Sequence, residues 1–407
     1  MAGLQHLSPP RLPAALVQSE STCQNKVMSI DVPPPPVFIP GEAPSEYRTV
    51  ATIRTYAAGP VICSGQGVMP ELRVDPVPDG LVVPSPSPAA EQPPPAAVSL
   101  SFDIAADGRP VSIRRLPPFP PLYGMAMADD IEPALAAWRF AAGAPRRHCS
   151  IAFEVRDVPV EQAEAQLLYL YLSTRGSNLF RYAPRELYDS ALARIRPVGA
   201  TCPRQPGARI WVWPDFDKIA APAGTIAWDY FGFDVDARGK AVRLRLLGSS
   251  GNADLDRRAV AALRQSVFTR PGTGCTYNFF RGPAKRTPPP PGPESMAAYR
   301  DEAATCDRPP ETAPVPAEGG WSKMAPLEFP ENFARRGLQG WAVVRYDVAP
   351  WGQTGNVRVV ESQPASGFGE AAKSIVQRSA RKPGPYGYTN CLETIRFKLP
   401  PREGEKE

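Results

Sequence analysis

The chain has 407 residues, and its composition of 43% hydrophobic and 21% charged residues allows most of it to fold around packed cores. The net charge of +5, without a Lys/Arg cluster among aromatic residues, argues against a nucleic-acid-binding protein, and the presence of only two histidines argues against sites built on several histidines. The sequence contains no run of about 18 apolar residues, so no transmembrane helix is predicted. Its 52 prolines favour ordered modules joined by Pro-rich spacers.

The first predicted element is a strand that begins at Cys23 and ends before the prolines at 33–36, because proline cannot continue a β-ladder. Short runs with the same strand character begin at Cys149, Cys275 and Cys391. These four cysteines recur at nearly regular intervals, which indicates an internal repeat.

The first complete unit is predicted at residues 44–160. Residues 44–46 open a segment that looks helical, because Pro and Glu suit a first helical turn, and the segment leads to Cys63. Residues 98–104 alternate apolar and polar side chains, and a turn at Gly108 leads to a return strand. A helix and the strand that begins at Cys149 complete the unit.

A linker is predicted at residues 161–183, followed by the second unit at residues 184–286. The linker contains a run rich in Leu and Tyr at 166–172, which is either an interaction helix or the buried face of a linking element. The second unit repeats the order of the first, with a helical opening, Cys202, a hairpin around Gly239, a helix capped by Asn252 and the strand at Cys275.

A Pro-rich spacer at residues 287–292 precedes the third unit at residues 293–401. This unit again has a helical opening, Cys306, a hairpin around Gly352, a helix and the strand at Cys391. The sequence therefore predicts an α+β fold of repeated β-β-α-β modules, each an antiparallel sheet covered by one helix.

One aspartate recurs at the same distance before the turn glycine of each unit. These residues are Asp103, Asp234 and Asp347. Each follows a core aromatic on an alternating strand and should face away from the core, so a solvated face or a local hydrogen bond is expected rather than catalysis.

The third unit carries an aromatic-Pro start at Phe329 and Pro330, glycines at 337 and 340, a Val-rich hairpin, a helix and a final strand that ends at residues 395–399. In this order, residues 329–399 resemble the C-terminal domain of the TonB family. Ser379 and Ala380 depart from the pattern, since aromatics are usual there. The first two units match less completely and are interpreted as diverged copies.

The resemblance implies a periplasmic binding protein of the TonB-domain type, associated with TonB-dependent transport across the outer membrane. Its implied partner is a peptide of an outer-membrane transporter, which adds as a strand to a sheet edge with unpaired N–H and C=O groups. The expected partner-binding residues are Phe329, Pro330, Thr394, Ile395, Arg396, Phe397, Lys398 and Leu399. Proline at Ile395 or Phe397 is expected to disrupt binding.

An alternative function is that of a structural or scaffolding repeat protein of the cell envelope without a peptide ligand. No nucleophile elbow, phosphate loop or Cys-x-x-Cys pair is present, so neither an enzyme nor a cofactor nor a metal site is expected. An energy transducer of the TonB family also needs a membrane anchor, and the sequence contains neither an anchor nor a signal peptide.

Six of the seven cysteines are predicted to pair within their units, as Cys63–Cys149, Cys202–Cys275 and Cys306–Cys391. Such disulfides would indicate the periplasm, and buried free thiols are the alternative. Cys23 is left over, so residues 1–40 are interpreted as the tail of a truncated repeat with a Pro-rich spacer. The alternative is a disordered leader with an incidental cysteine.

Overall fold

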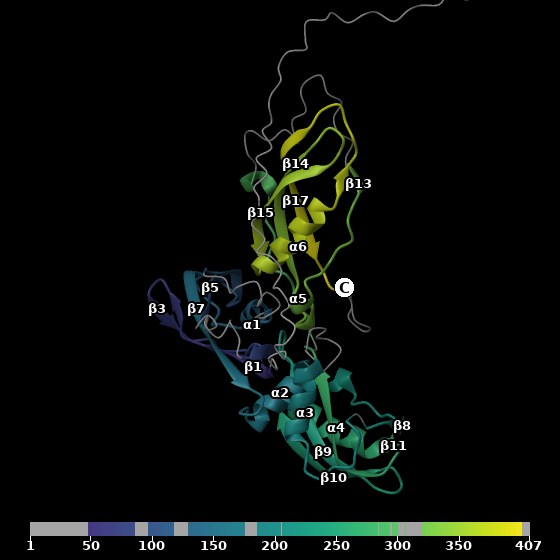
Figure 1. The fold of residues 1–407 in the computed structure, drawn as a ribbon. Helices are drawn as coiled ribbons and strands as arrows, with labels where there is room; N and C mark the ends of the chain where they lie inside the picture. Colours follow the sequence, from purple (N-terminus) through teal and green to yellow (C-terminus); the bar gives the residue numbers. More distant parts are fainter. Residues whose placement is uncertain are drawn as a thin grey trace, which may run out of the picture. The chain divides into compact units, whose positions relative to one another are not determined.

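The structure is a computed structural model (Figure 1). It describes residues 48–85, 97–117, 129–175, 185–204, 206–283, 285–293, 295–299, 306 and 320–400. The chain divides into Met1–Glu46 and Tyr47–Glu407. The first part lies outside the described residues, and Cys23 and the predicted truncated repeat lie within it.

The third unit contains a three-stranded antiparallel sheet with the strand order β15-β14-β17. Its elements are β14 (Gly340–Val348), β15 (Thr354–Gln363), α6 (Ser366–Gln377) and β17 (Tyr388–Phe397). Alternate strand residues such as Val344 and Ile395 share one apolar core with Phe368 and Ile375 of α6. The period of two along the strands thus directs one sheet face onto the apolar stripe of the helix.

Three shorter elements accompany this sheet. They are β13 (Trp321–Lys323), α5 (Glu331–Arg335) and β16 (Ala380–Arg381). Strand β13 pairs with β16, so the segment before the domain is attached to the chain that follows α6.

The second unit has the same arrangement, with the strand order β10-β9-β12. Its elements are β8 (Ala208–Ile210), the 3-10 helix Phe216–Lys218, β9 (Ala227–Val235), β10 (Ala241–Ser249), α4 (Ala253–Gln265), β11 (Val267–Phe268) and β12 (Gly272–Arg281). The predicted cap of α4 is confirmed, because the Asn252 side chain accepts a 3.0 Å hydrogen bond from the Leu255 N–H.

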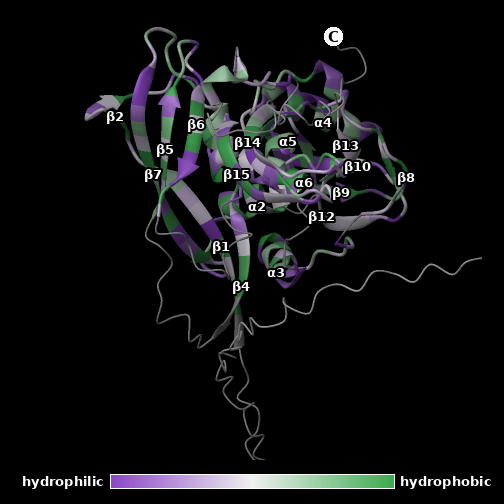
Figure 2. Ribbon diagram, turned by 90° about the horizontal axis from the view of Figure 1, so that it is seen from above, coloured by the Kyte–Doolittle hydropathy of each residue, from purple (hydrophilic) through white to green (hydrophobic). Residues whose placement is uncertain are grey.

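The first unit has the same order of strands and helix, but its sheet is larger. Its elements are β5 (Ala97–Ile104), β6 (Pro110–Arg115), α1 (Ile131–Ala137) and β7 (Arg146–Pro159). Figure 2 shows hydrophilic and hydrophobic residues alternating along β5 and β7. Four further strands extend the sheet, namely β1 (Arg48–Ala58), β2 (Val61–Cys63), β3 (Gln66–Val68) and β4 (Asp79–Ser85). The predicted fold class is therefore confirmed.

The helix expected from residues 44–46 onward is wrong, because the chain from Arg48 to Ala58 is strand β1. This segment is rich in Thr, Val and Ile, which favour strands, and it pairs with β4 and β7. The corresponding opening of the second unit is the helix α3 (Arg185–Ile195), and that of the third contains the 3-10 helix Met296–Tyr299.

The Leu- and Tyr-rich run of the predicted linker lies in helix α2 (Ala165–Arg175). Its residues Leu168, Tyr171 and Leu172 share a buried cluster with Trp228 and Tyr230 of β9. Of the two interpretations of this run, the structure therefore supports the buried linking element.

The hairpin turn is nearly identical in the three units. Gly108, Gly239 and Gly352 have φ angles of 78°, 81° and 92°. A Cβ atom at Gly352 would lie 2.1 Å from the carbonyl oxygen of Arg381, so only glycine fits this turn. Four residues later, Ser112, Arg243 and Asn356 also have positive φ, between 48° and 54°.

The first and third units are in direct contact. They share one cluster of buried apolar residues, which joins Leu135 and Trp138 of the first unit to Phe333 and Leu338 of the third. The Asn332 side chain donates a 2.7 Å hydrogen bond to the carbonyl oxygen of Asp129. The first and third modules therefore pack against each other and are not independent domains joined only by Pro-rich spacers.

Candidate functional site

Strand β17 lies at an edge of the third-unit sheet, because it pairs only with β14 among the described strands. The register runs from Gly340 opposite Phe397 to Tyr346 opposite Cys391. Of the predicted site residues, 394–397 lie within β17, whereas Lys398 and Leu399 follow its end. The edge on which the prediction depends is present, and its use in binding stays a prediction.

The side chains of β17 alternate between two faces. Ile395 and Phe397 are 5% and 0% exposed and belong to the core beneath α6. Thr394 and Arg396 lie on the opposite face, where Thr394 is partly buried and Arg396 is exposed.

The backbone groups alternate as well, and the first unit shows which of them point outward. On the outer side of β7, the Gly59 N–H donates a 2.8 Å hydrogen bond to the carbonyl oxygen of Ala152. Ala152 follows Cys149 by the same number of residues as Thr394 follows Cys391. Thr394, and Arg396 two residues later, therefore direct their N–H and C=O groups away from β14.

The same alternation corrects one expectation. Ile395 and Phe397 direct their backbone groups toward β14 and their side chains into the core. Proline at either position would break the domain's own sheet and core instead of testing a bound strand. The informative positions are Thr394 and Arg396.

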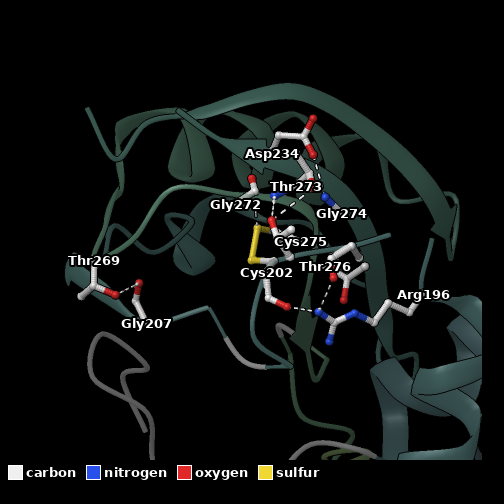
Figure 3. Close-up of a disulfide and its surroundings, with 12 residues drawn as sticks. Arg196, Cys202, Gly207, Asp234, Thr269, Gly272, Thr273, Gly274, Cys275 and Thr276 are labelled. Carbon is white, nitrogen blue, oxygen red and sulfur yellow. Dashed lines mark hydrogen bonds between the residues drawn. A yellow bond between two sulfur atoms is a disulfide. The ribbon is translucent and has the colours of Figure 1, made fainter. Parts of the chain in front are cut away.

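A recurrent hydrogen bond fixes the beginning of β17. The Asn390 N–H, at φ 55°, donates 2.8 Å to Oδ1 of Asp347. The equivalent bonds run from the His148 N–H to Asp103 (2.9 Å) and from the Gly274 N–H to Asp234 (2.7 Å). Figure 3 shows the bond to Asp234 beside the second disulfide. The recurrent aspartates thus make the local hydrogen bond that the strand pattern favoured.

A disulfide lies beside each of these hydrogen bonds and links the closing strand to the segment that precedes the hairpin of the same unit, called the leader below. The predicted pairs Cys63–Cys149, Cys202–Cys275 and Cys306–Cys391 are confirmed. In the second unit the Cys202 N–H donates 3.1 Å to the Thr273 carbonyl oxygen, beside the start of the closing strand (Figure 3). The Cys306–Cys391 bond accordingly anchors a leader at the beginning of β17, and the part that follows, residues 392–397, forms the candidate edge.

The aromatic-Pro start of the domain lies near the other end of this edge. The Phe329 ring makes edge-on contacts with Phe368 and Phe397, each with 5.9 Å between ring centroids. Phe329 therefore lies close to the end of β17 through core packing, and Pro330 is the residue that precedes α5.

Leu399 is not part of the free edge. Its N–H donates 3.0 Å to the Gln339 side chain, and its carbonyl oxygen accepts a 2.9 Å hydrogen bond from Arg286. The exposed charges near this end of β17 are those of Arg396 and Lys398. They favour a ligand with acidic residues at this end.

Two other strand sides in the first and third units carry partners among the described residues, whereas β12, the counterpart of β17 in the second unit, also pairs only with β9. In the first unit, β1 and β2 pair along the outer side of β7, which is the counterpart of the free side of β17. At the end of β15, the Ile113 N–H of β6 donates 2.9 Å to the carbonyl oxygen of Pro364. Within the first and third units, the outer side of β17 thus differs from the equivalent side of β7 in having no paired strand among the described residues.

A polar and aromatic cluster supports β17 on the side of α6. The Trp321 indole N–H donates 3.3 Å to Glu393, and the guanidinium of Arg381 lies 4.3 Å from the Trp321 ring and 3.2 Å from Glu393. Burial raises the pKa of Glu393, and Arg381 partly offsets this rise. The cluster supports the middle of the strand from the side of α6, and on the opposite face the Thr394 hydroxyl contacts Met296 Sδ at 3.4 Å.

Among the described residues, no group of three or more His, Cys, Asp or Glu side chains is placed to hold a metal ion. No helix in the described part of the chain is long and apolar enough to cross a membrane.

Comparison with known proteins identifies the third unit. No curated protein matches the sequence. Residues 325–399 match the family model described as Gram-negative bacterial TonB protein C-terminal. The match includes Phe329, Pro330, the β14–β15 hairpin, α6 and β17, and it does not include the first two units. Residues 325–399 of this chain are therefore a C-terminal domain of the TonB family.

Proposed function

We propose that this TonB C-terminal domain binds an extended peptide by strand addition to the outer side of β17. The proposed partner is a peptide of an outer-membrane transporter, and the protein acts in TonB-dependent transport as a member of the energy-transducer family. That family is associated with transport rather than with enzymatic catalysis.

The observation that carries this proposal is the outer side of β17, which has no strand partner among the described residues, within a matched TonB domain. Thr394 and Arg396 offer outward N–H and C=O groups on a strand that Asp347, Cys306 and α6 hold in place. Each new backbone hydrogen bond contributes about 0.5–1.5 kcal/mol, so a few bonds supply only part of the roughly −8 kcal/mol of a micromolar complex, and side-chain contacts must supply the rest.

The first unit supports the geometry of strand addition. There the chain's own strands β1 and β2 occupy the side of β7 that corresponds to the proposed binding side of β17. The sheet type thus accepts an added strand on this side. The same observation favours a second candidate function for the first unit, a structural role without a peptide ligand.

The periplasm is the proposed location. Three disulfides lie in the described part of the chain, and such bonds persist in oxidising compartments. We also propose that the units at 44–160, 184–286 and 293–401 are diverged copies, joined by the linker 161–183 and the spacer 287–292. The recurrent aspartate bond, turn glycine and disulfide support this relation.

The test uses Thr394→Pro in the full chain, because this change removes an outward N–H and proline is tolerated on edge strands. The probes are synthetic peptides that cover the periplasmic N-terminal segments of outer-membrane transporters from the same genome, titrated by fluorescence anisotropy. Thr394→Pro should weaken binding at least ~10-fold, which corresponds to the loss of roughly one backbone hydrogen bond together with the weakening of the adjacent one.

Thr394→Ala is the matched control, because it removes the same side chain and keeps the N–H. It should bind as the unmodified protein does. Equal affinity of a folded Thr394→Pro variant would show that this edge is not the site, and binding of no transporter peptide would favour the structural role.

A further inference from the structure

A cavity of 590 Å³ lies at the hairpin end of the third-unit sheet, away from the candidate edge. The side chains that matter here are Asp347, Trp351, Asn356 and Tyr388, and Gly355 also lines the cavity. The TonB resemblance assigns no role to it.

Asp347 supplies a carboxylate without a cationic partner. Its Oδ1 accepts from the Asn390 N–H (2.8 Å), and its Oδ2 accepts from the Asn356 side-chain amide (2.6 Å). Within the described residues no ion pair involves Asp347. The nearby guanidinium of Arg358 donates instead to the Asn390 side chain, at 3.0 Å.

The other two units show which group complements this carboxylate. In the second unit, the Nε of Arg243 donates to Asp234 at 2.5 Å, and Arg243 holds the position of Asn356. In the first unit, the guanidinium of Arg147 lies 3.9 Å from Asp103. The second unit thus places a guanidinium beside this aspartate from the position that Asn356 holds in the third unit, whereas the first unit has Ser112 there and brings Arg147 from β7.

An exposed aromatic ring lines the same cavity as the Asp347 carboxylate. Trp351, just before the turn glycine, is 68% exposed, and the equivalent positions hold Asp107 and Arg238. An indole face attracts a cation, and a guanidinium can also donate hydrogen bonds to a carboxylate. A large exposed tryptophan next to a lone carboxylate thus suits one ligand group in particular.

The cavity also has room that the other units lack. A Cβ atom placed on Gly355 meets no atom within 4 Å, and the equivalent positions hold Val111 and Val242. The third unit therefore combines three differences at one place. It has an amide where the other units have Ser112 and Arg243, an exposed tryptophan before the turn glycine, and a glycine where the other units have valine.

We propose that this cavity binds an arginine side chain of a partner protein, with the guanidinium between Asp347 and Trp351. The external residue would take the place that Arg243 occupies in the second unit. This contact is separate from strand addition at β17, so either can fail without the other.

The test follows the Trp351 indole N–H signal by NMR in the full chain and assigns it by Trp351→Phe. The probe is N-acetyl-arginine amide, and the comparison probe is N-acetyl-citrulline amide, which has nearly the same shape and no charge. We expect a saturable shift with the arginine probe and none with citrulline. Two variants should each weaken binding at least ~10-fold. They are Gly355→Val, which places a branched side chain in the cavity, and Asn356→Arg, which introduces the arginine that the second unit has at this position.

Gly67→Val is the matched control. It makes the same change on strand β3 of the first unit, where a Cβ atom also meets open space, and it should leave the shift unchanged. Methyl glucoside serves as an uncharged probe that can stack on the indole. The proposal is overturned if citrulline amide binds equally, or if methyl glucoside binds and the arginine probe does not. It is also overturned if no probe shifts the signal, or if Asn356→Arg binds the arginine probe with unchanged affinity.

Discussion

Asp229 places a carboxyl group inside the core of the second unit, where the equivalent positions of the first and third units hold Val98 and Ala342. Its Oδ1 accepts a 2.8 Å hydrogen bond from the Phe279 N–H, and its Oδ2 has no hydrogen-bond partner among the residues that the structure describes. Burial raises its pKa to about 8, and the neighbouring charge of Asp256 adds to this rise.

Because of Asp229, we expect the free energy of unfolding to fall as the pH rises. The folded protein keeps the proton of Asp229 up to about pH 8, whereas in the unfolded chain this carboxyl has its ordinary pKa of 3.8. Between these values the unfolded state binds fewer protons, so the free energy of unfolding decreases with pH, by at most roughly 1.4 kcal/mol per pH unit. Asp229→Asn should remove this dependence and unfold at higher urea than the unmodified protein at pH 9.

The control is Asp254→Asn, a partly exposed carboxyl in the first turn of α4 that pairs with Arg257. It should leave the pH profile close to that of the unmodified protein. Parallel profiles of Asp229→Asn and the unmodified protein from pH 5 to pH 9 would contradict the assignment.

For individual residues, the sequence predicts which of them lie in a strand better than it predicts the direction in which their side chains point. The alternation of β17 marked residues 394–397 as a strand, but only the pairing with β14 shows that Ile395 and Phe397 turn inward. The cavity beside Asp347 was missed. Its signal was present in the sequence as the replacement of Arg243 by Asn356 and of Val242 by Gly355, and it becomes visible once the units are compared residue by residue.

Among the elements, the hairpins, the closing strands and the three disulfides could be predicted, because turn glycines and paired cysteines are local or recurrent signals. Strand β1 could not be predicted in the same way. Its partners β4 and β7 lie far along the chain, and long-range pairing overrides the local preference for a helical start at residues 44–46. The docking of α5 on Asp129 is equally non-local.

The Cys202–Cys275 disulfide should contribute strongly to the stability of the second unit. It closes a loop with a sequence separation of 73 residues, for which the chain-entropy model gives ~4 kcal/mol. The double variant Cys202→Ser/Cys275→Ser should therefore unfold at lower urea, as followed by near-ultraviolet circular dichroism. Non-reducing peptide mapping of the unmodified protein checks the pairing itself. Free thiols at both positions, or an unchanged unfolding midpoint of the double variant, would rule out this contribution.

For the molecule as a whole, Arg336 connects all three units. Its Nε donates 2.7 Å to the carboxylate of Asp130, and its other nitrogens donate to the carbonyl oxygens of Gly224 (2.9 Å) and Asp75 (3.2 Å). The side chains of Arg336 and Asp130 are 1% and 6% exposed. Arg336 directly precedes Gly337 of the TonB domain, so this side chain adds a buried ion pair with the first unit and a hydrogen bond with the second to the apolar cluster that the first and third units share.

Removing this guanidinium should be costly, because it leaves Asp130 as an uncompensated buried charge. Arg336→Met should lower the free energy of unfolding by ~3–5 kcal/mol, whereas Arg378→Gln, which breaks the exposed pair with Glu328, should cost less than ~1 kcal/mol. The double variant Arg336→Met/Asp130→Leu removes both charges and should recover part of the loss. Urea unfolding of the unmodified protein and the three variants measures these differences. If Arg336→Met costs no more than Arg378→Gln, or if the double variant is no more stable than Arg336→Met alone, the buried pair does not hold the three units together.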